Sequence, residues 1–534
     1  MNLVSKNKVQ ALKLSCINNS IYRYLIAVMV MFLSLPTLCA AATYYISPAG
    51  SDEANGVEKV SAWKTFAYAF SKLTPGDTLI LVNGTYHEPL RPTVSGSAGK
   101  PITLKAETVG GAIIEMQVDG AAIEIYSDTR KTISYITIEG VIARGHGEYS
   151  AIDIFSSDSV SEPQMTNNII IRSTGAFGSA NLSNSKVISL GNNLRDSLFE
   201  DIWAYGYGRK AMQAFGCLRV TIRRAVLRYD YWDGAGYKPN DPRVTFSGYN
   251  TQDSIFENII ALDSAPTPPG RSSDRAGIVA SGNQTPAIIS GSRNNKYLGI
   301  ISLNNVGNGF EVNGGTGDST KGIYFKDIIS WHNSANGFNI QGNDDGSYIV
   351  NSLFGKCGKA GLRLNPYPSY PIVNAVIRNC FAYYNSGSGY YYGVNQVVQF
   401  LNNTGVGNAN SGLEPEYAPE LKYIVKPAGV ANYERGATIT HRYIDGQLST
   451  TQALWPWPYE NVIKDCMCDP EDLKVVKRVA ESGEGWEPGW CKSNKTLTQY
   501  IWEYLGQPIP SEIYGAQNSG CGAPPDATPN TRIE

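Results

Sequence analysis

Two segments, residues 228–243 and 263–275, concentrate side chains that can transfer protons or neutralise charge. Only 17% of the 534 residues are charged, yet both segments mix carboxylates with basic side chains. Removing a proton beside a carboxylate requires a cation to neutralise the carboxylate and a base to accept the proton. The residues that we assign to this catalytic work are Lys238, Arg243 and Arg228. The pKa of lysine is normally near ~10.4, so Lys238 acts as a base only where burial or the two arginines lower it.

Three aspartates of the same segments are of the ligand type that calcium prefers. Asp230 and Asp233 belong to the first segment, and Asp263 opens the second. Hard divalent cations bind several oxygen ligands at once. We therefore expect Ca²⁺ at these residues if the fold brings the two segments together. A plainer interpretation stays open, because loops collect charge and Asp-Gly and Asn-Asp-Pro are ordinary turn formers.

A polar row with aromatic neighbours is the second chemical feature. When the repeats described below are aligned, one outward-facing position is occupied by Gln213, Lys238, Val279, Glu311, Asn339 and Arg363. Sugar hydroxyls need hydrogen-bond donors and acceptors, and sugar faces stack on aromatic rings. The pattern therefore predicts a shallow groove for a linear polysaccharide. The residues that we expect to bind it are Gln213, Tyr231, Trp232, Tyr237, Arg275, Glu311, Asn339 and Arg363.

These side chains need a repeating scaffold, and the chain contains a repeat of roughly two dozen residues or more. Each repeat has a short β-prone stretch, and most continue into Asn/Gly-rich turn residues. The stretches begin at Glu200, Arg223, Glu257, Leu298, Lys326, Val350 and Arg378. Such units cannot bury an apolar face alone, so they stack, with strands pairing in parallel about 4.8 Å apart. The pattern predicts an all-β parallel β-helix, a solenoid, over residues 43–412.

Smaller signals predict how the solenoid is capped and held in register. The stretch from Trp63 to Leu73 has apolar residues at helical spacing, which predicts a helix that caps the first coil. Asn305, Asn333 and Asn385 follow their strands at one common position, where stacked amides can form a ladder. Residues 413–534 lack the repeat and form a C-terminal extension with two predicted short helices.

The compartment follows from the N-terminus and the cysteines. Residues 1–42 have the charged, apolar and small-residue regions of an export signal, so we expect a secreted or periplasmic monomer with no membrane span after cleavage. An uncleaved anchor stays open. An oxidising compartment predicts disulfides among Cys466, Cys468, Cys491 and Cys521, whereas Cys217, Cys357 and Cys380 fit small core residues. With Lys+Arg 45 against Asp+Glu 47, the chain has no charge excess for nucleic acid.

Three stretches near the N-terminus carry a family resemblance: Tyr44-Tyr-Ile-Ser-Pro-Ala-Gly-Ser-Asp52, Trp63-Lys-Thr-Phe and Pro75-Gly-Asp-Thr-Leu-Ile-Leu-Val-Asn-Gly-Thr-Tyr86. They resemble the opening of secreted right-handed β-helix proteins related to pectate lyases and chondroitinase-type lyases. The resemblance implies a right-handed parallel β-helix and activity on polysaccharides.

Two further stretches are similar to motifs of family-nine polysaccharide lyases. Asn308-Gly-Phe-Glu-Val-Asn-Gly-Gly315 resembles the stretch that carries the catalytic lysine of that family, but Glu311 stands in the place of the lysine. Tyr231-Trp-Asp-Gly234 partly resembles its acidic calcium motif. The comparison therefore moves the expected base to Lys238.

These features favour an exported lyase that cleaves an acidic, uronate-containing polysaccharide by β-elimination. Three alternatives stay open. A glycoside hydrolase would use two of the carboxylates Asp233, Asp263 and Glu311. A C5-epimerase would add a second acid, for which Tyr237 is the candidate, and a non-catalytic glycan-binding or envelope protein would use the groove for binding only.

Overall fold

The computed structural model describes residues 41–147, 149–178, 186–207, 209–230, 244–262, 276–282, 289–366, 369–392, 396–401, 403–406, 408–414, 442–444 and 447–449, with residues 494, 497 and 500. The chain divides into two units, Met1–Ala42 and Thr43–Glu534, and the fold below is that of the second unit. Among the described residues, no helix combines the length and the apolar character needed to cross a bilayer. The predicted leader, the helices of the C-terminal extension and the four C-terminal cysteines fall outside these ranges.

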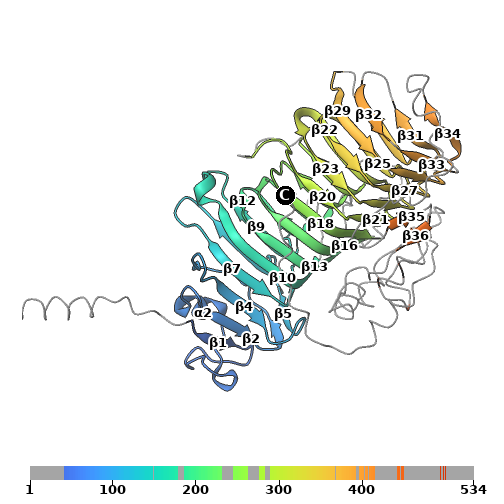
Figure 1. Cartoon of the computed structure of the whole chain (residues 1–534). Coiled ribbons are helices and arrows are strands. Elements are labelled where there is room, and N and C mark those ends of the chain that lie inside the picture. The colour runs from blue at the N-terminus through green and yellow to red at the C-terminus, as the bar shows by residue number, and fades with distance from the viewer. Residues whose placement is uncertain are drawn as a thin grey trace, which may run out of the picture. The chain divides into compact units, whose positions relative to one another are not determined.

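The strands stack in parallel, coil upon coil, in sequence order (Figure 1). Glu200 pairs with Arg223, and Arg223 pairs with Glu257 in the next coil. The same register continues through Leu298, Lys326, Val350 and Arg378. The repeat alignment is thereby confirmed, and the molecule is a parallel β-helix.

The strands of each coil belong to three faces of the solenoid. The first face holds β1 (Thr43–Ile46), β2 (Thr78–Leu81), β4 (Ile102–Ala106), β7 (Ser134–Glu139), β20 (Lys296–Leu298), β23 (Tyr324–Lys326), β26 (Tyr348–Val350), β29 (Ile372–Arg378) and β32 (Gln396–Leu401). The second face holds β3 (Gly84–Tyr86), β5 (Ala112–Glu115), β8 (Val141–Arg144), β21 (Ile301–Leu303), β24 (Ile329–Trp331), β27 (Leu353–Gly355), β30 (Phe381–Tyr383) and β33 (Thr404–Val406). Four longer strands span both faces: β10 (Thr166–Gly178), β13 (Leu198–Tyr207), β16 (Thr221–Asp230) and β18 (Ile255–Leu262).

The third face, which we call the groove face, carries the candidate site. It holds β6 (Ile123–Ser127), β9 (Ile152–Ser156), β11 (Lys186–Leu190), β14 (Lys210–Phe215), β17 (Val244–Tyr249), β19 (Ala276–Ser281), β22 (Asn308–Lys321), β25 (Phe338–Asp345), β28 (Leu362–Asn365), β31 (Ser388–Tyr392) and β34 (Asn410–Glu414). The short elements are β12 (Leu194–Arg195), β15 (Cys217–Leu218), η1 (Lys59–Ser61), η2 (Glu162–Gln164) and the antiparallel pair β35 (Arg442–Ile444) and β36 (Gln447–Ser449).

A left-handed residue marks the bend between the first and second faces. It is the second residue of each repeat, with φ of 53° at Asp201, 53° at Asn258 and 50° at Asn351. This region costs most L-residues roughly 1–2 kcal/mol, and Asn, Asp and Gly tolerate it best. Arg224 also has φ 53°, and its side chain is held by two hydrogen bonds to the Asp201 carboxylate, 2.6 and 2.9 Å long.

Alternation along each strand fills the interior with apolar side chains. Phe310, Phe338 and Leu362 point inward and are fully buried. One continuous core runs from Ile46 to Tyr390. Aromatic rings pack against one another along the axis. The ring centroids of Phe256 and Tyr297 lie 4.7 Å apart, and those of Phe310 and Phe338 lie 5.7 Å apart in nearly parallel planes.

The capping helix is confirmed as α2 (Phe66–Lys72), which begins after the N-cap Thr65. The Thr65 hydroxyl accepts a hydrogen bond from the Tyr68 amide, 3.2 Å long. Phe66 and Phe70 are buried in the main core, so the helix closes the apolar interior of the first coil. It is shorter than the predicted stretch because Trp63 forms a parallel bridge with Ile46 instead.

The asparagine ladder is also confirmed. The Asn305 amide group donates to Asn333 Oδ1 over 3.2 Å, and the Asn385 amide group donates to Asn408 Oδ1 over 2.8 Å. Cys357 interrupts the ladder, and its backbone N–H donates to Asn385 Oδ1 over 3.0 Å. The three described cysteines, Cys217, Cys357 and Cys380, are buried and unbridged, as predicted for core residues.

Opposite charges pair from coil to coil on the outside of the first face. Arg223 holds the Glu200 carboxylate with hydrogen bonds of 2.6 and 2.8 Å, and Arg172 lies 3.4 Å from it. Burial alone would raise the pKa of Glu200, but these arginines together with Arg224 hold it below its usual range. The pairs favour the observed register over a slipped one.

The left-handed bend predicts a residue-specific effect on stability. Replacing Asn351 by Ala should lower the free energy of unfolding by roughly 1 kcal/mol. Alanine is disfavoured at positive φ, because it lacks the short polar side chain that lets asparagine tolerate this conformation. Asn351→Gly, which tolerates this conformation, should stay within about 0.5 kcal/mol of the wild type. Thermal melting of both variants measures the difference, and equal losses would show that side-chain contacts rather than backbone conformation matter here.

Candidate functional site

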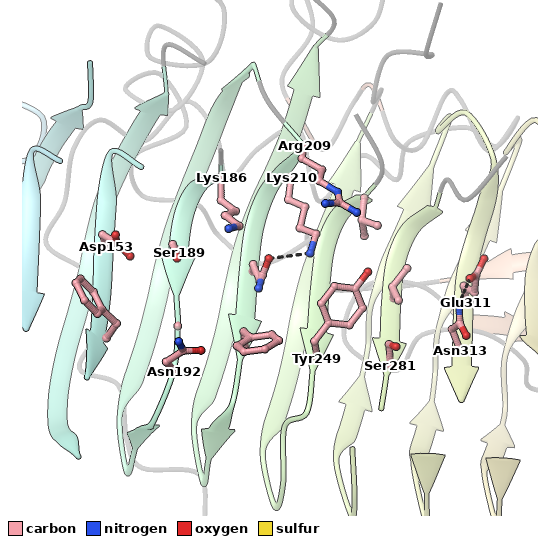
Figure 2. Close-up of a pocket in the computed structure, with 16 residues that line it drawn as sticks. Asp153, Lys186, Ser189, Asn192, Arg209, Lys210, Tyr249, Ser281, Glu311 and Asn313 are labelled. Atoms are coloured by element: carbon pink, nitrogen blue, oxygen red, sulfur yellow. Dashed lines mark hydrogen bonds between the residues drawn. The ribbon is translucent and has the colours of Figure 1, made fainter. Parts of the chain in front are cut away.

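A groove of about 540 Å³ crosses the outside of the groove face, over β9, β11, β14, β17, β19 and β22 (Figure 2). Neighbouring strands of a sheet lie about 4.8 Å apart, so the groove is several coils long. Its lining side chains come from equivalent positions of successive coils. Loops are therefore not needed to form its floor.

The central row of the groove is set by strand register. Asp153 pairs with Ser189, Ser189 with Gln213, and Gln213 with Ser247. The row continues through Val279, Glu311, Asn339 and Arg363. This confirms the predicted alignment of Gln213, Val279, Glu311, Asn339 and Arg363 in one outward-facing row.

Lys238 does not belong to that row, and this part of the alignment was wrong. Ser247 stands between Gln213 and Val279, because β17 begins at Val244, after the whole of the 231–243 segment. The spacing in the sequence alone did not show how much of this segment is inserted before the strand. The relocation of the base to Lys238, which depended on this alignment, loses its structural support.

Three basic side chains gather at one part of the groove, as Figure 2 shows. Lys186 and Lys210 are register partners on β11 and β14, and Arg209 directly precedes β14. Lys210 is only 5% exposed. Its ammonium donates to Gln213 Oε1 over 2.7 Å and lies 4.0 Å from the ring centre of Tyr249. An amide and an aromatic face therefore hold this cation in place.

The pKa values of two groove residues are shifted toward each other. Burial raises the pKa of Asp153 to about 6, although a hydrogen bond from Ser189 and the charge of Lys186 act against the shift. Burial lowers the pKa of Lys186, and Arg209 lowers it further, while Asp153 opposes the change. Titratable groups perturbed in this way within a cleft are typical of acid–base sites.

Aromatic side chains line the groove beside the central row. Phe215 and Tyr249 are register partners on β14 and β17, and Phe155 lies on β9 at the other side of β11. Gly191 of the intervening coil leaves the surface between the rings open. Such rings offer stacking faces for sugar units.

The far end of the groove is marked by a buried carboxylate. Glu311 is 5% exposed and lines the groove from β22. It accepts hydrogen bonds from the side-chain amides of Asn308, Asn313 and Gln341, over 2.9, 3.2 and 3.0 Å. These amides hold the carboxylate in one place.

The other predicted site residues either lie away from the groove or fall outside the described residues. Arg228 is fully buried on β16 with its guanidinium carbon 5.0 Å from the Tyr205 ring centre, and it does not line the groove. The following fall outside the described parts of the chain, so their roles stay predictions: Tyr231, Trp232, Asp233, Tyr237, Lys238, Arg243, Asp263, Arg275 and the side chain of Asp230. Over the described residues, no group of three or more His, Cys, Asp or Glu side chains is arranged to hold a metal.

Sequence reasoning missed the basic cluster and its acidic partner. Ile152-Asp-Ile and Ile188-Ser-Leu have the inward–outward alternation of Phe310-Glu-Val, which is the signal that would have found Asp153. Lys186 and Lys210 stand three residues before Ser189 and Gln213, at the position of Asn308. The alignment of this second signature began at Gln213. Extending it by two coils, to residue 152, adds Ser189 and Asp153 to the row, and Lys186 and Lys210 line the groove beside it.

No protein-family model matches the chain. A curated relative, the uncharacterized protein YwoF of Bacillus subtilis (strain 168), is 34% identical over 144 residues, which cover 26% of this chain and 30% of that protein. The match thus spans less than a third of either chain.

Several solved structures are similar at low sequence identity. XylC in complex with xylose has 12% identity and a TM-score of 0.45, covering 69% of this chain and 84% of that chain. The pectate lyase Pel9A has 15% identity and a TM-score of 0.41, covering 73% and 86%. The Dettilon tailspike protein has 11% identity and a TM-score of 0.43, covering 63% of each. Scores this low assign no activity, so function must be inferred from the groove itself.

The interaction between Asp153 and Lys186 is testable by chemical labelling. Because a carboxylate stabilises a nearby ammonium, Asp153→Asn should lower the pKa of Lys186. The pH midpoint for acylation of Lys186 by acetic anhydride, followed by peptide mass spectrometry, should therefore fall below the wild-type midpoint. Glu53→Gln, an exposed change outside the groove, serves as the control. A midpoint unchanged in Asp153→Asn would show that the two groups do not interact.

Proposed function

We propose that the groove binds an acidic polysaccharide and cleaves it by β-elimination, with Lys186 as the base. The observation that carries this proposal is the basic cluster of Lys186, Arg209 and Lys210 on adjacent coils of one polar groove. Lys210 and Arg209 supply fixed positive charge for a uronate carboxylate. Lys186, whose pKa is lowered by burial and by Arg209, is the lysine suited to accept a proton.

The proposed reaction balances without a redox partner. The neutral Lys186 amine takes the proton from C5 of the uronate, and the C5–H electron pair forms the C4=C5 double bond. The C4–O bond breaks, and the leaving oxygen takes a proton. The groove is open to solvent, so water can supply that proton. The products are a new sugar end and an unsaturated uronate.

The groove also explains how a sugar chain would be held. Phe155, Phe215 and Tyr249 provide apolar faces, while Ser189 and Gln213 provide hydroxyl and amide groups in the central row. Binding in a solvated groove needs many modest contacts spread along the polymer. This pattern favours a chain that lies along the stacked coils.

Hydrolysis fits the groove less well than elimination. Glycoside hydrolases need two carboxylates roughly 5 to 10 Å apart. Among the described residues, two acidic side chains line the groove, Asp153 and Glu311, and five pairing steps separate them, from β9 through β11, β14, β17 and β19 to β22. At about 4.8 Å per step they lie roughly 24 Å apart, which is too far to flank one bond.

Calcium and export stay part of the proposal. Ca²⁺ at Asp230, Asp233 and Asp263 would supply further positive charge for the substrate carboxylate. The predicted export signal supports an activity outside the cytoplasm. Assays with and without a chelator test the metal separately from the basic cluster.

The elimination is tested with the purified mature chain and a panel of acidic polysaccharides. The wild type should form product with the ultraviolet absorbance of an unsaturated uronate. Lys186→Met should lower kcat by about 10²- to 10⁴-fold and retain polymer binding, because only the base is lost. Lys210→Met should mainly raise KM, and Lys296→Met, an exposed change on the first face, is the control.

Two results would overturn parts of this proposal. Polymer binding without product over long incubation would show that the protein binds glycans but does not cleave them. Full activity in Lys186→Met together with loss in Lys238→Ala would return the base to the 231–243 segment.

A further inference from the structure

The outer side of the second face carries one continuous apolar row. Ile202 and Ala204 belong to the main core, so Trp203 between them on β13 points away from the interior. Strand register continues this outward position from coil to coil. The row, which we call the outer stripe, consists of Trp203, Val226, Ile260, Ile301, Ile329, Leu353 and Phe381. Its six pairing steps of about 4.8 Å make it roughly 29 Å long.

The side chains of the outer stripe are buried although they point outward. Phe381 is 5% exposed and the others are fully buried, yet none of them belongs to the main core. Outward side chains of the first face differ, since Tyr348 on β26 is 45% exposed and Val397 on β32 is 62% exposed. Alternation within the coils therefore does not explain the burial. A sheet that is apolar on both sides needs a further layer of chain on its outer side.

Two tryptophans on this side show that water does not reach it. Trp203 and Trp331, which also lies outward on β24, are both buried. Their indole N–H groups have no hydrogen-bond partner among the described residues. Water at an open surface would hydrogen-bond such groups. An exposed apolar stripe of this length would also be unusual for a monomer, so a covering segment is required.

The covering layer comes from the same chain. The structure holds one copy of the chain, and the stripe is buried within it. After β34 the chain continues to Glu534 in the same compact unit as the coils. In that part, Leu497 and Tyr500 have helical conformation and are 0% and 7% exposed. None of the described core clusters contains them, so they pack against another apolar surface.

We propose that the C-terminal extension docks on the outer stripe, with Leu497 and Tyr500 among its anchoring side chains. Two apolar side chains three residues apart share one side of a helix, which suits packing on a flat apolar sheet. The extension also contains Leu454-Trp-Pro-Trp-Pro-Tyr459, a segment of the same apolar character. Docking gives both surfaces the apolar partner that each requires. The inference concerns the second face and does not rest on the function proposed for the groove.

Cross-linking of the intact chain tests the docking. Lys356 is exposed beside the stripe, with its ammonium 5.8 Å from the ring centre of Trp331. A short amine-reactive reagent, followed by peptide mass spectrometry, should link Lys356 to lysines of the extension. These are Lys422, Lys426, Lys464, Lys474, Lys477, Lys492 and Lys495. Lys296, which is exposed on the first face, is the control and should form about five-fold fewer of these links, because the solenoid separates the two faces.

Two substitutions weaken the contact from opposite sides. Ile329→Glu places a charge in the middle of the stripe, and Leu497→Glu places one in the extension, outside the main core. Each should reduce the links from Lys356 about five-fold and expose the extension to trypsin, because an unpaired buried charge disfavours docking. Val397→Glu makes a similar change at an exposed position of the first face and should leave both readouts unchanged. Leu497→Glu keeps the test decisive if Ile329→Glu does not fold.

Three results would overturn the inference. The first is a wild-type chain in which Lys356 forms no links to the extension. The second is a set of links that persists undiminished in both Ile329→Glu and Leu497→Glu. The third comes from a mixture of isotopically light and heavy chains: links from Lys356 that form only between copies would make the stripe an interface between two molecules instead.

Discussion

The register between successive coils is the constraint on which the rest of this protein depends. Side chains alternate between inside and outside with a period of two, so a slip by one residue would turn Phe310 outward and Glu311 inward. Three devices oppose such a slip. Left-handed residues fix the bend in each coil, amide ladders join Asn305 to Asn333 and Asn385 to Asn408, and Arg223 clamps Glu200 of the preceding coil.

Register also explains how side chains from separate coils come to line one groove. Each coil contributes one or two side chains at equivalent positions, and stacking converts these single positions into continuous rows. Asp153 and Glu311 are far apart in the sequence, yet they line the same groove. Changing one residue therefore changes one place along the bound polymer, which makes such a surface easy to retune for different chains of sugars.

The chemistry of the groove comes from burial as much as from residue type. Lys186 and Asp153 are common surface residues, but loss of water around them shifts their pKa values in opposite directions, and Arg209 adds to the shift at the lysine. Lys210 shows a different use of a lysine, because Gln213 and Tyr249 hold it as a fixed cation. Neighbouring lysines on adjacent coils thus suit different tasks.

The β-helix, its capping helix, the inward Phe310 and Phe338, and the amide ladder could all be predicted from the chain alone, because they follow from local alternation, helical spacing and turn chemistry. It also placed Gln213, Glu311, Asn339 and Arg363 in one row, since their strands carry clear repeats. Folding was needed to show that Ser247 rather than Lys238 stands in that row, that Arg228 is buried against Tyr205, and that Lys186, Lys210 and Asp153 line one groove. The physical reason is that pairing between coils depends on how much chain each turn takes up. Because the segments between the strands differ in length, the sequence alone does not show which residues pair.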